Sequence, residues 1–516
     1  MQIIDNKALL IKVREPERIT NALRTAKKIN DTQVLVKWGL EEAQVLNNLR
    51  LKGVPSPIMK DYVWPGLQKP FKHQYETAAF LTLNRRAFCF NEQGTGKTAS
   101  AIWAADYLMN IGAIRRVLVL CPLSIMQSAW ENDLFKFATH RTCAIAHSYS
   151  KEKRIKAVED GAEFVICNYD GLPIVRDAIV KGGFDLIIID EANAYKNVST
   201  KRWKMLTSIM SPSTWVWMMT GTPAAQAPTD AYGLAKIVNP NAVPKFFGAF
   251  RDMVLTRITQ FRWVPKSQSE QVVHMALQPA IRFTKDECLD LPEMTYVMRD
   301  IPLTPQQKKY YEEIRKQMLT IAAGEEITAV NAAASMNKLL QLSCGAVYSD
   351  TGDVVAFDAK NRMTALLEVI EEASQKVIVF VPFRHAIDII VEELRANSIP
   401  CEAITGSVSA SKRTEIFNKF QQQKDPRVLV IQPQAAAHGV TLHAANVVVW
   451  WGPITSIETY LQANARVHRA GQHHPCTVVH LQGSPVEKRI YKMLSQKLDV
   501  HTKIIDLYRN FLQEVA

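Results

Sequence analysis

The stretch NEQGTGKTAS (91–100) holds the first residues whose types and spacing could do chemistry, and it follows the apolar run RAFCF. A glycine-rich turn between a strand and a helix lets backbone N–H groups surround phosphate oxygens, and the helix N-terminus adds a favourable potential. A lysine in this pattern reaches the β- and γ-phosphates, and the hydroxyl after it ligates Mg²⁺. Asn91 departs from the generic motif, which has glycine there. The residues that we expect to hold a nucleoside triphosphate are Gly94, Thr95, Gly96, Lys97 and Thr98.

A pair of carboxylates, Asp190 and Glu191, follows the segment DLIII (185–189), which ends in four apolar residues. If this run is a strand, both acids lie at the carboxyl edge of a parallel sheet, where the ligands of such sheets bind. Asp190 would hold Mg²⁺ through water, and Glu191 would orient and deprotonate the attacking water. An acidic pair at a helix N-terminus is the ordinary alternative. The presence of Lys97 earlier in the same group of strands favours the catalytic interpretation.

Two arginines, Arg466 and Arg469, lie three residues apart in QANARVHRAGQ (462–472). Three residues are nearly one helical turn, so both side chains could point the same way; a solvated helix face is the ordinary alternative. Phosphoryl transfer builds negative charge on the transferred group, and arginines from outside the phosphate loop stabilise it. The pair therefore predicts two arginine fingers, which would act when a second lobe closes over the nucleotide.

The elements that must position these residues form two groups of buried-strand runs separated by helix-length segments. Such alternation, with strands that are apolar almost throughout, predicts parallel α/β sheets. The first group (66–240) contains RAFCF, VLVLCP, FVICNY, DLIIID and WVWMMT, and the second (355–480) contains KVIVFV, CEAIT, VLVIQ, VVVWW and TVVHL. The expected fold class is therefore α/β with two tandem parallel-sheet lobes.

The remaining segments are expected to support these lobes. Residues 241–354 lack the alternation of apolar strand runs and helix-length segments, which predicts a mainly helical linker or insertion. Within it, Thr304 is expected to cap a helix that begins at Pro305. Residues 1–65 predict a small basic α/β domain, with 11 basic and 7 acidic residues, a net charge of +4. Residues 481–516 predict bracing helices.

Composition restricts the class of protein further. The chain has 516 residues, 62 of them Lys or Arg and 50 Asp or Glu, a formal charge of +12 that suits a polyanionic partner. The eight cysteines form no closely spaced pairs, which argues against a zinc knuckle or a disulfide framework. No apolar run approaches the length of a membrane span, and no signal peptide is visible. We expect a soluble, monomeric protein of a bacterial or phage-infected cytoplasm, without a membrane partner.

GTGKT, DEAN, TGTP (220–223) and QANARVHRAGQ occur in the order found in superfamily two helicases. NEQGTGKT resembles the Swi/Snf loop D-E-x-G-x-G-K-T. Its closing motif Q-A-x-x-R-x-x-R-x-G-Q is similar to the stretch that contains Gln462, Ala463, Arg466, Arg469, Gly471 and Gln472. The likeness covers about residues 66–500 and is closest in form to compact annealing-helicase or phage members. It implies RecA-like lobes that use ATP and Mg²⁺.

The resemblance also implies roles for residues whose type and spacing alone predict no function. Gln74 would read adenine, and Gly439 and Gln462 would complete the ATP site. The TGTP motif would couple the nucleotide to DNA through Thr220, Gly221 and Thr222. The DNA backbone would be contacted by Ser124, Asn168, Thr405 and Gln432. One motif departs from the family, because QPQAAAHG (432–439) stands where S-T-R-A-G-G-x-G is usual.

The sequence therefore predicts a DNA-dependent ATPase that translocates along double-stranded or branched DNA and could remodel forks, anneal strands or displace proteins. A strand-separating DNA or RNA helicase is the first alternative. It would need a wedge hairpin or base-stacking aromatics, for which FF (246–247) and FRW (261–263) could serve, although core packing is the more common use of such residues. A non-catalytic, nucleotide-sensing scaffold is the second. It is disfavoured because the lysine, the acid pair and both arginines are present.

Overall fold

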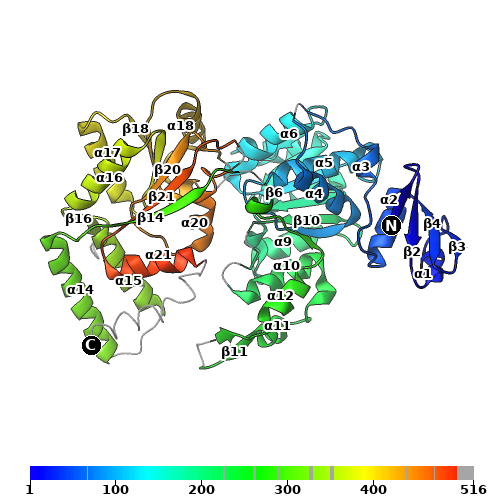
Figure 1. Cartoon of the computed structure of the whole chain (residues 1–516), viewed down its shortest axis with the longest axis horizontal. Helices are drawn as coiled ribbons and strands as arrows, with labels where there is room; N and C mark the ends of the chain where they lie inside the picture. Colours follow the sequence, from blue (N-terminus) through cyan, green and yellow to red (C-terminus); the bar gives the residue numbers. More distant parts are fainter. Residues whose placement is uncertain are drawn as a thin grey trace. The chain divides into compact units, whose positions relative to one another are not determined.

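The structure is a computed structural model in which the chain forms two compact units (Figure 1). The first unit comprises Met1–Ala224 and Pro228–Cys288, and the second is built from the chain beyond Cys288. The structure describes residues 1–66, 68–221, 223–224, 227–259, 263–288, 291–324, 329–348, 354–436, 440–469 and 471–496. None of the helices within these ranges is long and apolar enough to cross a membrane.

The first unit is centred on a seven-stranded sheet in the order β13-β5-β10-β9-β6-β8-β7, with every neighbouring pair parallel. All five predicted strands of this group are confirmed. The strands are β5 Arg86–Cys89, β6 Val117–Cys121, β7 Cys143–Ile145, β8 Phe164–Asn168, β9 Leu186–Asp190, β10 Trp215–Met219 and β13 Ala280–Ile281. The helices of this unit are α4 Lys72–Leu83, α5 Lys97–Asn110, α6 Asn132–Phe137, α7 Lys151–Glu159, α8 Leu172–Gly182, α9 Lys201–Ile209, α10 Ala231–Val238, α11 Phe247–Val254, α12 Ser269–Ala276 and α13 Lys285–Cys288.

Successive residues of the central strands pack into two different cores. In β6, Val117 and Val119 belong to one hydrophobic cluster, whereas Leu118 and Leu120 belong to another. Because side chains alternate between the faces of a strand, the sheet has a hydrophobic core on each face. Burial on both faces is why these strands read as continuous apolar runs.

The N-terminal residues form a small α/β element with its own core, as the sequence predicts. Its four antiparallel strands have the order β1-β2-β4-β3, and Leu9, Ile11, Val34 and Val36 face a common cluster. The elements are β1 Gln2–Ile4, β2 Ala8–Lys12, α1 Pro16–Ala22, β3 Lys27–Asn30, β4 Gln33–Lys37, α2 Leu40–Asn48 and, in the following linker, α3 Ile58–Asp61. Gln44 of α2 donates to the Thr82 carbonyl of α4 at 2.9 Å, so α2 is bonded to the large sheet's helices.

The second unit contains a six-stranded parallel sheet in the order β14-β21-β20-β17-β19-β18. The five predicted runs are again confirmed. The strands of the unit are β14 Met294–Asp300, β15 Ala346–Tyr348, β16 Val354–Ala356, β17 Lys376–Phe380, β18 Cys401–Ile404, β19 Val428–Ile431, β20 Ala445–Trp450 and β21 Cys476–Gln482. Its helices are α14 Pro305–Gly324, α15 Ala329–Ser343, α16 Lys360–Glu372, α17 Arg384–Ala396, α18 Ala410–Gln422, α19 Pro433–Ala436, α20 Ile457–Asn464 and α21 Pro485–Ser495.

The segment 241–354, which we predicted as one mainly helical insertion, is divided between the two units at Cys288. Besides helices it supplies an edge strand to each sheet, β13 to the first and β14 to the second. The helix at Pro305 is confirmed: the Thr304 hydroxyl accepts from Gln307 N at 3.3 Å, and the Gln307 side chain accepts from Thr304 N at 3.1 Å. This reciprocal pair satisfies two N–H groups at the start of α14.

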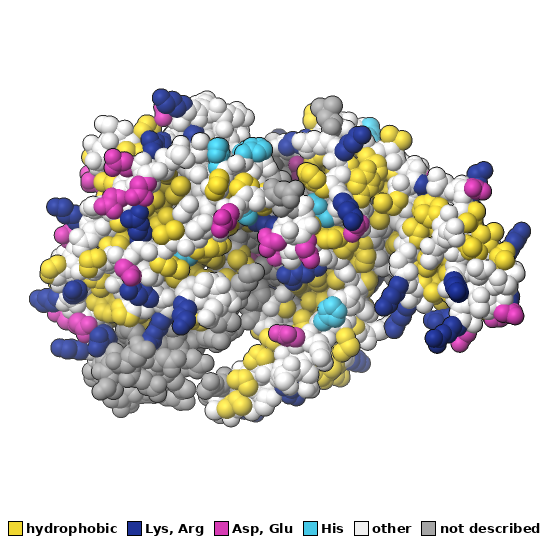
Figure 2. Space-filling view, in the orientation of Figure 1, with side chains coloured by type: hydrophobic (Ala, Val, Ile, Leu, Met, Phe, Trp, Pro, Cys, Tyr) yellow, Lys and Arg dark blue, Asp and Glu magenta, His cyan; other side chains and the backbone are white. Residues whose placement is uncertain are grey.

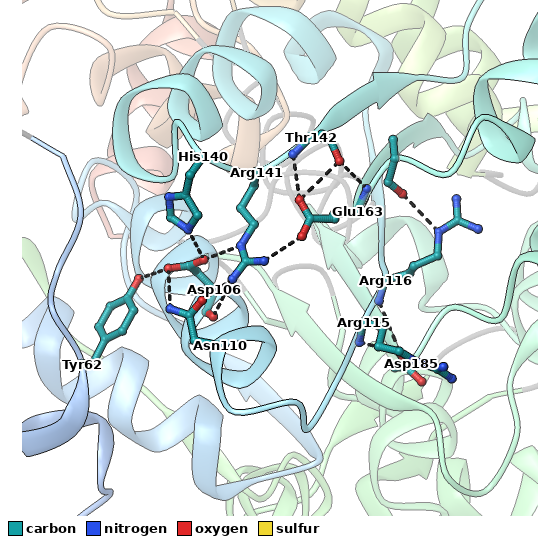
Figure 3. A network of polar contacts seen from close by, with 11 residues as sticks. Tyr62, Asp106, Asn110, Arg115, Arg116, His140, Arg141, Thr142, Glu163 and Asp185 are labelled. Atoms are coloured by element: carbon teal, nitrogen blue, oxygen red, sulfur yellow. Dashed lines mark hydrogen bonds and ion pairs between the residues drawn. The ribbon is translucent and has the colours of Figure 1, made fainter.

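A buried polar network fixes the far end of α5, the helix that starts at Lys97 (Figure 3). The Asp106 carboxylate accepts hydrogen bonds from Tyr62 Oη at 2.6 Å, Arg141 Nε at 2.5 Å and His140 Nε2 at 2.8 Å. Arg141 also donates to Glu163 Oε1 at 2.7 Å. The network therefore joins α5 to the linker at Tyr62 and to the loop that precedes β7.

Candidate functional site

Three of the predicted motifs begin in one row across the first sheet. Met219 of β10 is paired in register with Cys89 of β5 on one side and with Asp190 of β9 on the other. Neighbouring strands lie about 4.8 Å apart, so the backbones of Cys89 and Asp190 are roughly 10 Å apart. The phosphate loop, the TGTP motif and the carboxylate pair therefore emerge side by side at the carboxyl edge of the sheet.

The pKa of the Cys89 thiol is affected by two charged groups at this edge of the sheet. Burial raises the pKa of Cys89 to about 11; the Lys97 ammonium acts to lower this pKa, and the Asp190 carboxylate acts to raise it. Both charges therefore lie close enough to act on the same buried group. The structure brings together the lysine and the aspartate that the sequence predicts as partners.

The backbone of the loop before α5 turns sharply at two glycines. Gly94 and Gly96 have φ angles of +87° and +80°, in the left-handed region that favours glycine. Lys97 Nζ donates to the carbonyl oxygens of Asn91 at 2.9 Å and Glu92 at 3.3 Å, and Thr95 Oγ1 donates to Glu92 O at 2.7 Å. The loop is thus a closed turn that carries the ammonium group on its inner side.

Gln74 lies against this loop, although nothing in its own surroundings in the sequence marks it. It is buried on α4, which packs beside α5 (Figure 1), and its Nε2 donates to the Thr95 carbonyl at 3.2 Å. His73 Nε2 bonds to the same carbonyl at 2.8 Å. A Cβ atom on Gly96 would come within 2.1 Å of Gln74 Nε2. The glutamine and the loop therefore form one packed unit.

Asn91, the departure from the generic motif, has a structural reason. Its side chain is buried, its Nδ2 donates to Thr77 Oγ1 of α4 at 2.8 Å, and its Oδ1 accepts from Phe283 N at 3.0 Å. Glycine could make neither bond. Asn91 therefore joins the start of the loop to α4 on one side and to the segment after β13 on the other.

The segment 279–285 continues along the loop beyond the end of β5. Phe90 N donates to the Ile281 carbonyl at 2.8 Å, and Glu92 N donates to the Phe283 carbonyl at 2.9 Å. Lys285 N in turn donates to Glu92 Oε2 at 3.2 Å. The sequence did not predict that residues 279–285 contact the loop, because their partners are almost two hundred residues earlier in the chain.

Hydrogen bonds hold Asp190, the first residue of the carboxylate pair, in place. Asp190 is buried at the end of β9; its Oδ2 accepts from Trp130 Nε1 at 3.0 Å and its Oδ1 from Glu191 N at 2.9 Å. Tyr169 Oη donates to the Asp190 carbonyl. Glu191 has a φ of +48°, a strained conformation for a residue with a side chain, and such strain is concentrated at functional sites. Trp130 and Tyr169, which the sequence motifs did not single out, are therefore residues that donate hydrogen bonds to Asp190 from neighbouring elements.

The other predicted residues of the first unit lie at the same edge. Thr220 is buried and its N–H donates to the Cys89 carbonyl at 3.1 Å, while Gly221 follows it beside the Gln93 side chain. Asn168 ends β8, in register with Cys121 at the end of β6. Ser124 falls in the 3₁₀ helix Leu123–Ile125 just beyond Cys121, but its side chain lies outside the described residues, as does Thr222.

In the second unit, Thr405 and Gln432 are brought together at the carboxyl edge of the sheet. They follow the neighbouring strands β18 and β19, and Gln432 Oε1 accepts from Gly406 N at 3.2 Å. The Thr405 hydroxyl is 2.8 Å from that of Ser407. Gln432 therefore binds the adjacent turn in the place where the family motif has a hydroxyl. Gly439, a predicted nucleotide contact, lies outside the described residues.

The two arginines do not share a helix, because α20 ends at Asn464 and both follow it in turns. Arg466 is buried and its carbonyl accepts from Leu442 N at 2.9 Å. Gln462, also buried, donates from Nε2 to Glu458 at 3.3 Å within α20.

The arginine turns are held in place by the last residue of the motif. Gln472 Nε2 donates to the carbonyls of Ala445 at 2.8 Å and Val467 at 3.3 Å. The closing glutamine of the motif is thus a structural tie between the arginine turns and the start of β20.

The donor set at the first unit's edge fits Mg²⁺. Mg²⁺ is commonly held by one or two protein oxygens together with phosphates and water, and Thr98 and Asp190 offer a hydroxyl and a carboxylate. In the part of the chain that the structure describes, no group of three or more His, Cys, Asp or Glu side chains could hold a metal ion. A magnesium ion would therefore take its remaining ligands from the bound phosphates and from water.

Two family profiles match the chain: the SNF2-related domain over residues 36–344 and the helicase conserved C-terminal domain over residues 361–471. An uncharacterized ATP-dependent helicase of Mycoplasma pneumoniae is 28% identical over 446 residues; the match covers 83% of this chain but only 41% of that relative's length. Protein p41 of Acyrthosiphon pisum secondary endosymbiont phage 1 is 25% identical, with 80% of this chain and 92% of that protein covered. Among solved structures, the Sulfolobus solfataricus SWI2/SNF2 ATPase core in complex with dsDNA aligns with a TM-score of 0.42 and 23% identity, over 88% of this chain and 96% of that one.

Proposed function

Because this chain belongs to the SNF2-related family, we propose that it is an ATPase that moves along double-stranded DNA. The observation that carries the proposal is the row formed by Cys89, Met219 and Asp190. This register supports a single site in which the phosphate loop, the coupling motif and the acid pair act on one nucleotide. The match of a helicase C-terminal domain to the second unit supports a two-lobed motor.

Each residue of the site has a proposed task. Lys97 neutralises the β- and γ-phosphates, and the backbone N–H groups of the loop bind their oxygens. Mg²⁺, held by Thr98 and Asp190, would neutralise the phosphate charge. Glu191 accepts the proton of the attacking water, and its backbone has the strained conformation that is concentrated at functional sites.

Two further contributions come from the motifs beyond the loop. Gln74, which already touches the loop, would bind the adenine. Arg466 and Arg469 of the second unit would stabilise the charge that develops on the transferred phosphoryl group. Their use would make hydrolysis depend on the two units acting together, so that chemistry is coupled to movement.

The proposed grip on DNA uses short polar side chains at the ends of parallel strands. Asn168 in the first unit and Thr405 and Gln432 in the second occupy such positions. Contacts of this type recognise phosphates without reading base identity, as a motor that moves over any sequence requires. The chain's charge of +12 supports binding to a polyanion that weakens as salt is added.

A second candidate function is separation of the two strands, and one observation favours it. Phe246, which directly precedes α11, and Phe247, its first residue, are 70% and 43% exposed. Exposed aromatic rings at the surface can stack on unpaired bases. Translocation along the duplex and strand separation therefore predict different preferred cofactors for ATP hydrolysis.

ATP hydrolysis measured with equal amounts of duplex DNA, single-stranded DNA and RNA tests the proposal. We expect the strongest stimulation by duplex DNA and loss of activity in Lys97→Ala. Lys151→Ala is the matched control, because Lys151 is also the first residue of a helix but lies exposed on α7. Stimulation chiefly by single strands or RNA would contradict duplex translocation and favour strand separation. Equal rates with and without nucleic acid would contradict both.

A further inference from the structure

The chain between β10 and β13 forms a projection on the first unit that the nucleotide site does not use. It contains α10, α11 and α12 and the short antiparallel strands β11 Leu255–Arg257 and β12 Trp263–Pro265. In Figure 1 these helices lead away from the seven-stranded sheet, and β11 lies at the far end. Figure 2 shows hydrophobic side chains gathered at this end of the projection.

The exposed rings of the projection are held on a rigid base. Phe247 makes an edge contact with Tyr232, their ring centroids being 5.5 Å apart, and Tyr232 also packs against the buried Phe250. Tyr232 Oη donates to the Lys245 carbonyl at 2.8 Å, which fixes the turn that carries Phe246. Phe247 therefore loses little conformational entropy when a ligand covers it, and the backbone beside Phe246 is already held in place.

Cations accompany these rings. Lys245 Nζ lies 5.5 Å from the Phe246 ring centroid, and the guanidinium carbons of Arg251 and Arg257 lie 4.1 Å and 6.0 Å from that of Trp263.

The acidic charge on this surface is already engaged. Among the described residues between 245 and 266, four are basic (Lys245, Arg251, Arg257 and Lys266) and one, Asp252, is acidic. The Asp252 carboxylate is paired with Arg251 at 3.1 Å. The surface thus combines apolar rings with an excess of positive charge.

We infer that this aromatic protrusion, formed by Lys245, Phe246, Phe247, Arg251, Arg257 and Trp263, binds single-stranded nucleic acid. Each nucleotide of a single strand offers a flat base face that can stack on a ring and a backbone phosphate that can pair with a cation, whereas a duplex hides the base faces inside its own stack. An acidic peptide would match the charge but not the rings. The inference rests on the proposed function, and it names unpaired nucleotides at a branch or fork as the DNA that the first unit engages.

Equilibrium binding of a fluorescein-labelled oligothymidylate to the full-length chain, without ATP, tests the inference. We expect Phe246→Ala to weaken binding about tenfold, because the loss of one base–aromatic stack weakens binding by roughly fivefold to 150-fold, and we expect Phe246→Trp to retain it. Lys245→Gln with Arg257→Gln is expected to reduce the slope of log affinity against log salt by about 0.7 for each lost phosphate contact. Phe135→Ala is the matched control, because Phe135 is a 77% exposed ring on α6 outside the protrusion.

Photo-crosslinking of an oligothymidylate that contains 4-thiothymidine provides a second measurement. Crosslinks within residues 245–266 are expected in the parent chain, and crosslinking should fall in Phe246→Ala. Unchanged affinity in Phe246→Ala, or crosslinks only elsewhere, would overturn the inference and leave the protrusion as a surface for a protein partner. Because no ATP is present, this failure is distinct from absence of duplex-stimulated hydrolysis, which would refute the proposed function alone.

Discussion

Replacing Asp106 by asparagine tests whether the buried network of Figure 3 holds the nucleotide-binding helix in place. The Asp106 side chain is 1% exposed, and Arg141, to which it is bonded, is 12% exposed. Asp106→Asn keeps the shape of the side chain and removes its charge. Oδ1 of the new amide can still accept from Arg141, and its Nδ2 can donate to the Tyr62 hydroxyl. The change therefore isolates the buried charge from packing.

The magnitude follows from burial. Removing one partner of a buried ion pair costs about 3–5 kcal/mol, because the remaining charge has lost both water and its counterion. Arg141 keeps its bond to Glu163 at 2.7 Å, which places the expected loss near the lower limit, at about 3 kcal/mol. Asp177→Asn is the control, since Asp177 also pairs with an arginine at 2.7 Å but is 83% exposed. Such a surface pair contributes less than about 1 kcal/mol.

Urea unfolding followed by tryptophan fluorescence would measure both free energies. The first unit of Asp106→Asn is expected to unfold at clearly lower urea than that of the parent or Asp177→Asn. Asp106 is nine residues along α5 from Lys97, or about 13 Å, so ATP hydrolysis per folded molecule should not change. A loss of stability no greater than that of Asp177→Asn would refute the argument that the buried charge holds α5.

Three further outcomes are expected. Gly96→Ala should weaken ATP binding at least about tenfold in equilibrium titration, because the new Cβ would meet Gln74 Nε2 and the φ of +80° disfavours a side chain; unaltered affinity would contradict this packing. Asn91→Asp should raise the KM for ATP about fivefold, because the Thr77 hydroxyl already donates to the His73 carbonyl and needs a donor from residue 91; a KM equal to the parent's would show that this bond is dispensable. Burial lowers the pKa of His480 to about 4, so the unfolded chain binds the proton more readily than the folded one between about pH 6.5 and pH 4. Stability of the second unit should therefore fall by up to about 1.4 kcal/mol per pH unit as the pH drops through this range, and His480→Phe should remove that dependence in urea titrations at several pH values.

The central strands could be predicted because a strand that is buried on both faces is a nearly continuous run of apolar residues. VLVLC at residues 117–121 contains only apolar residues, and the structure buries all five. The edge strand β14 was missed, because Met294–Asp300 mixes polar and apolar residues and only partly buries some of them. An edge strand has one neighbour and an exposed face, so its composition differs little from that of a loop.

The site was predictable only where spacing along the chain is short. Gly94 to Thr98 form a local turn, and the motif therefore specifies its own geometry. The hydrogen bond that Phe283 N donates to Asn91 Oδ1 joins residues 192 positions apart, and no local sequence pattern predicts it. The predicted helical spacing of Arg466 and Arg469 was wrong because α20 ends at Asn464. The segment that carries these arginines is held by Gln472, which donates to the carbonyls of His443, just before β20, and of Ala445, the first residue of β20.

The two edge strands that flank Cys288 have a consequence for synthesis on the ribosome. β13 completes the first sheet beside β5, although about 190 residues separate them in the chain, and β14 must wait for β21, which begins at Cys476. At roughly 5–20 residues per second, each delay lasts on the order of ten to forty seconds. During the first delay the edge of β5 beside the phosphate loop is open in the nascent chain, and during the second β14 has no partner strand. A chain terminated before residue 476 would therefore retain a complete first sheet and a permanently unpaired β14, a template for aggregation.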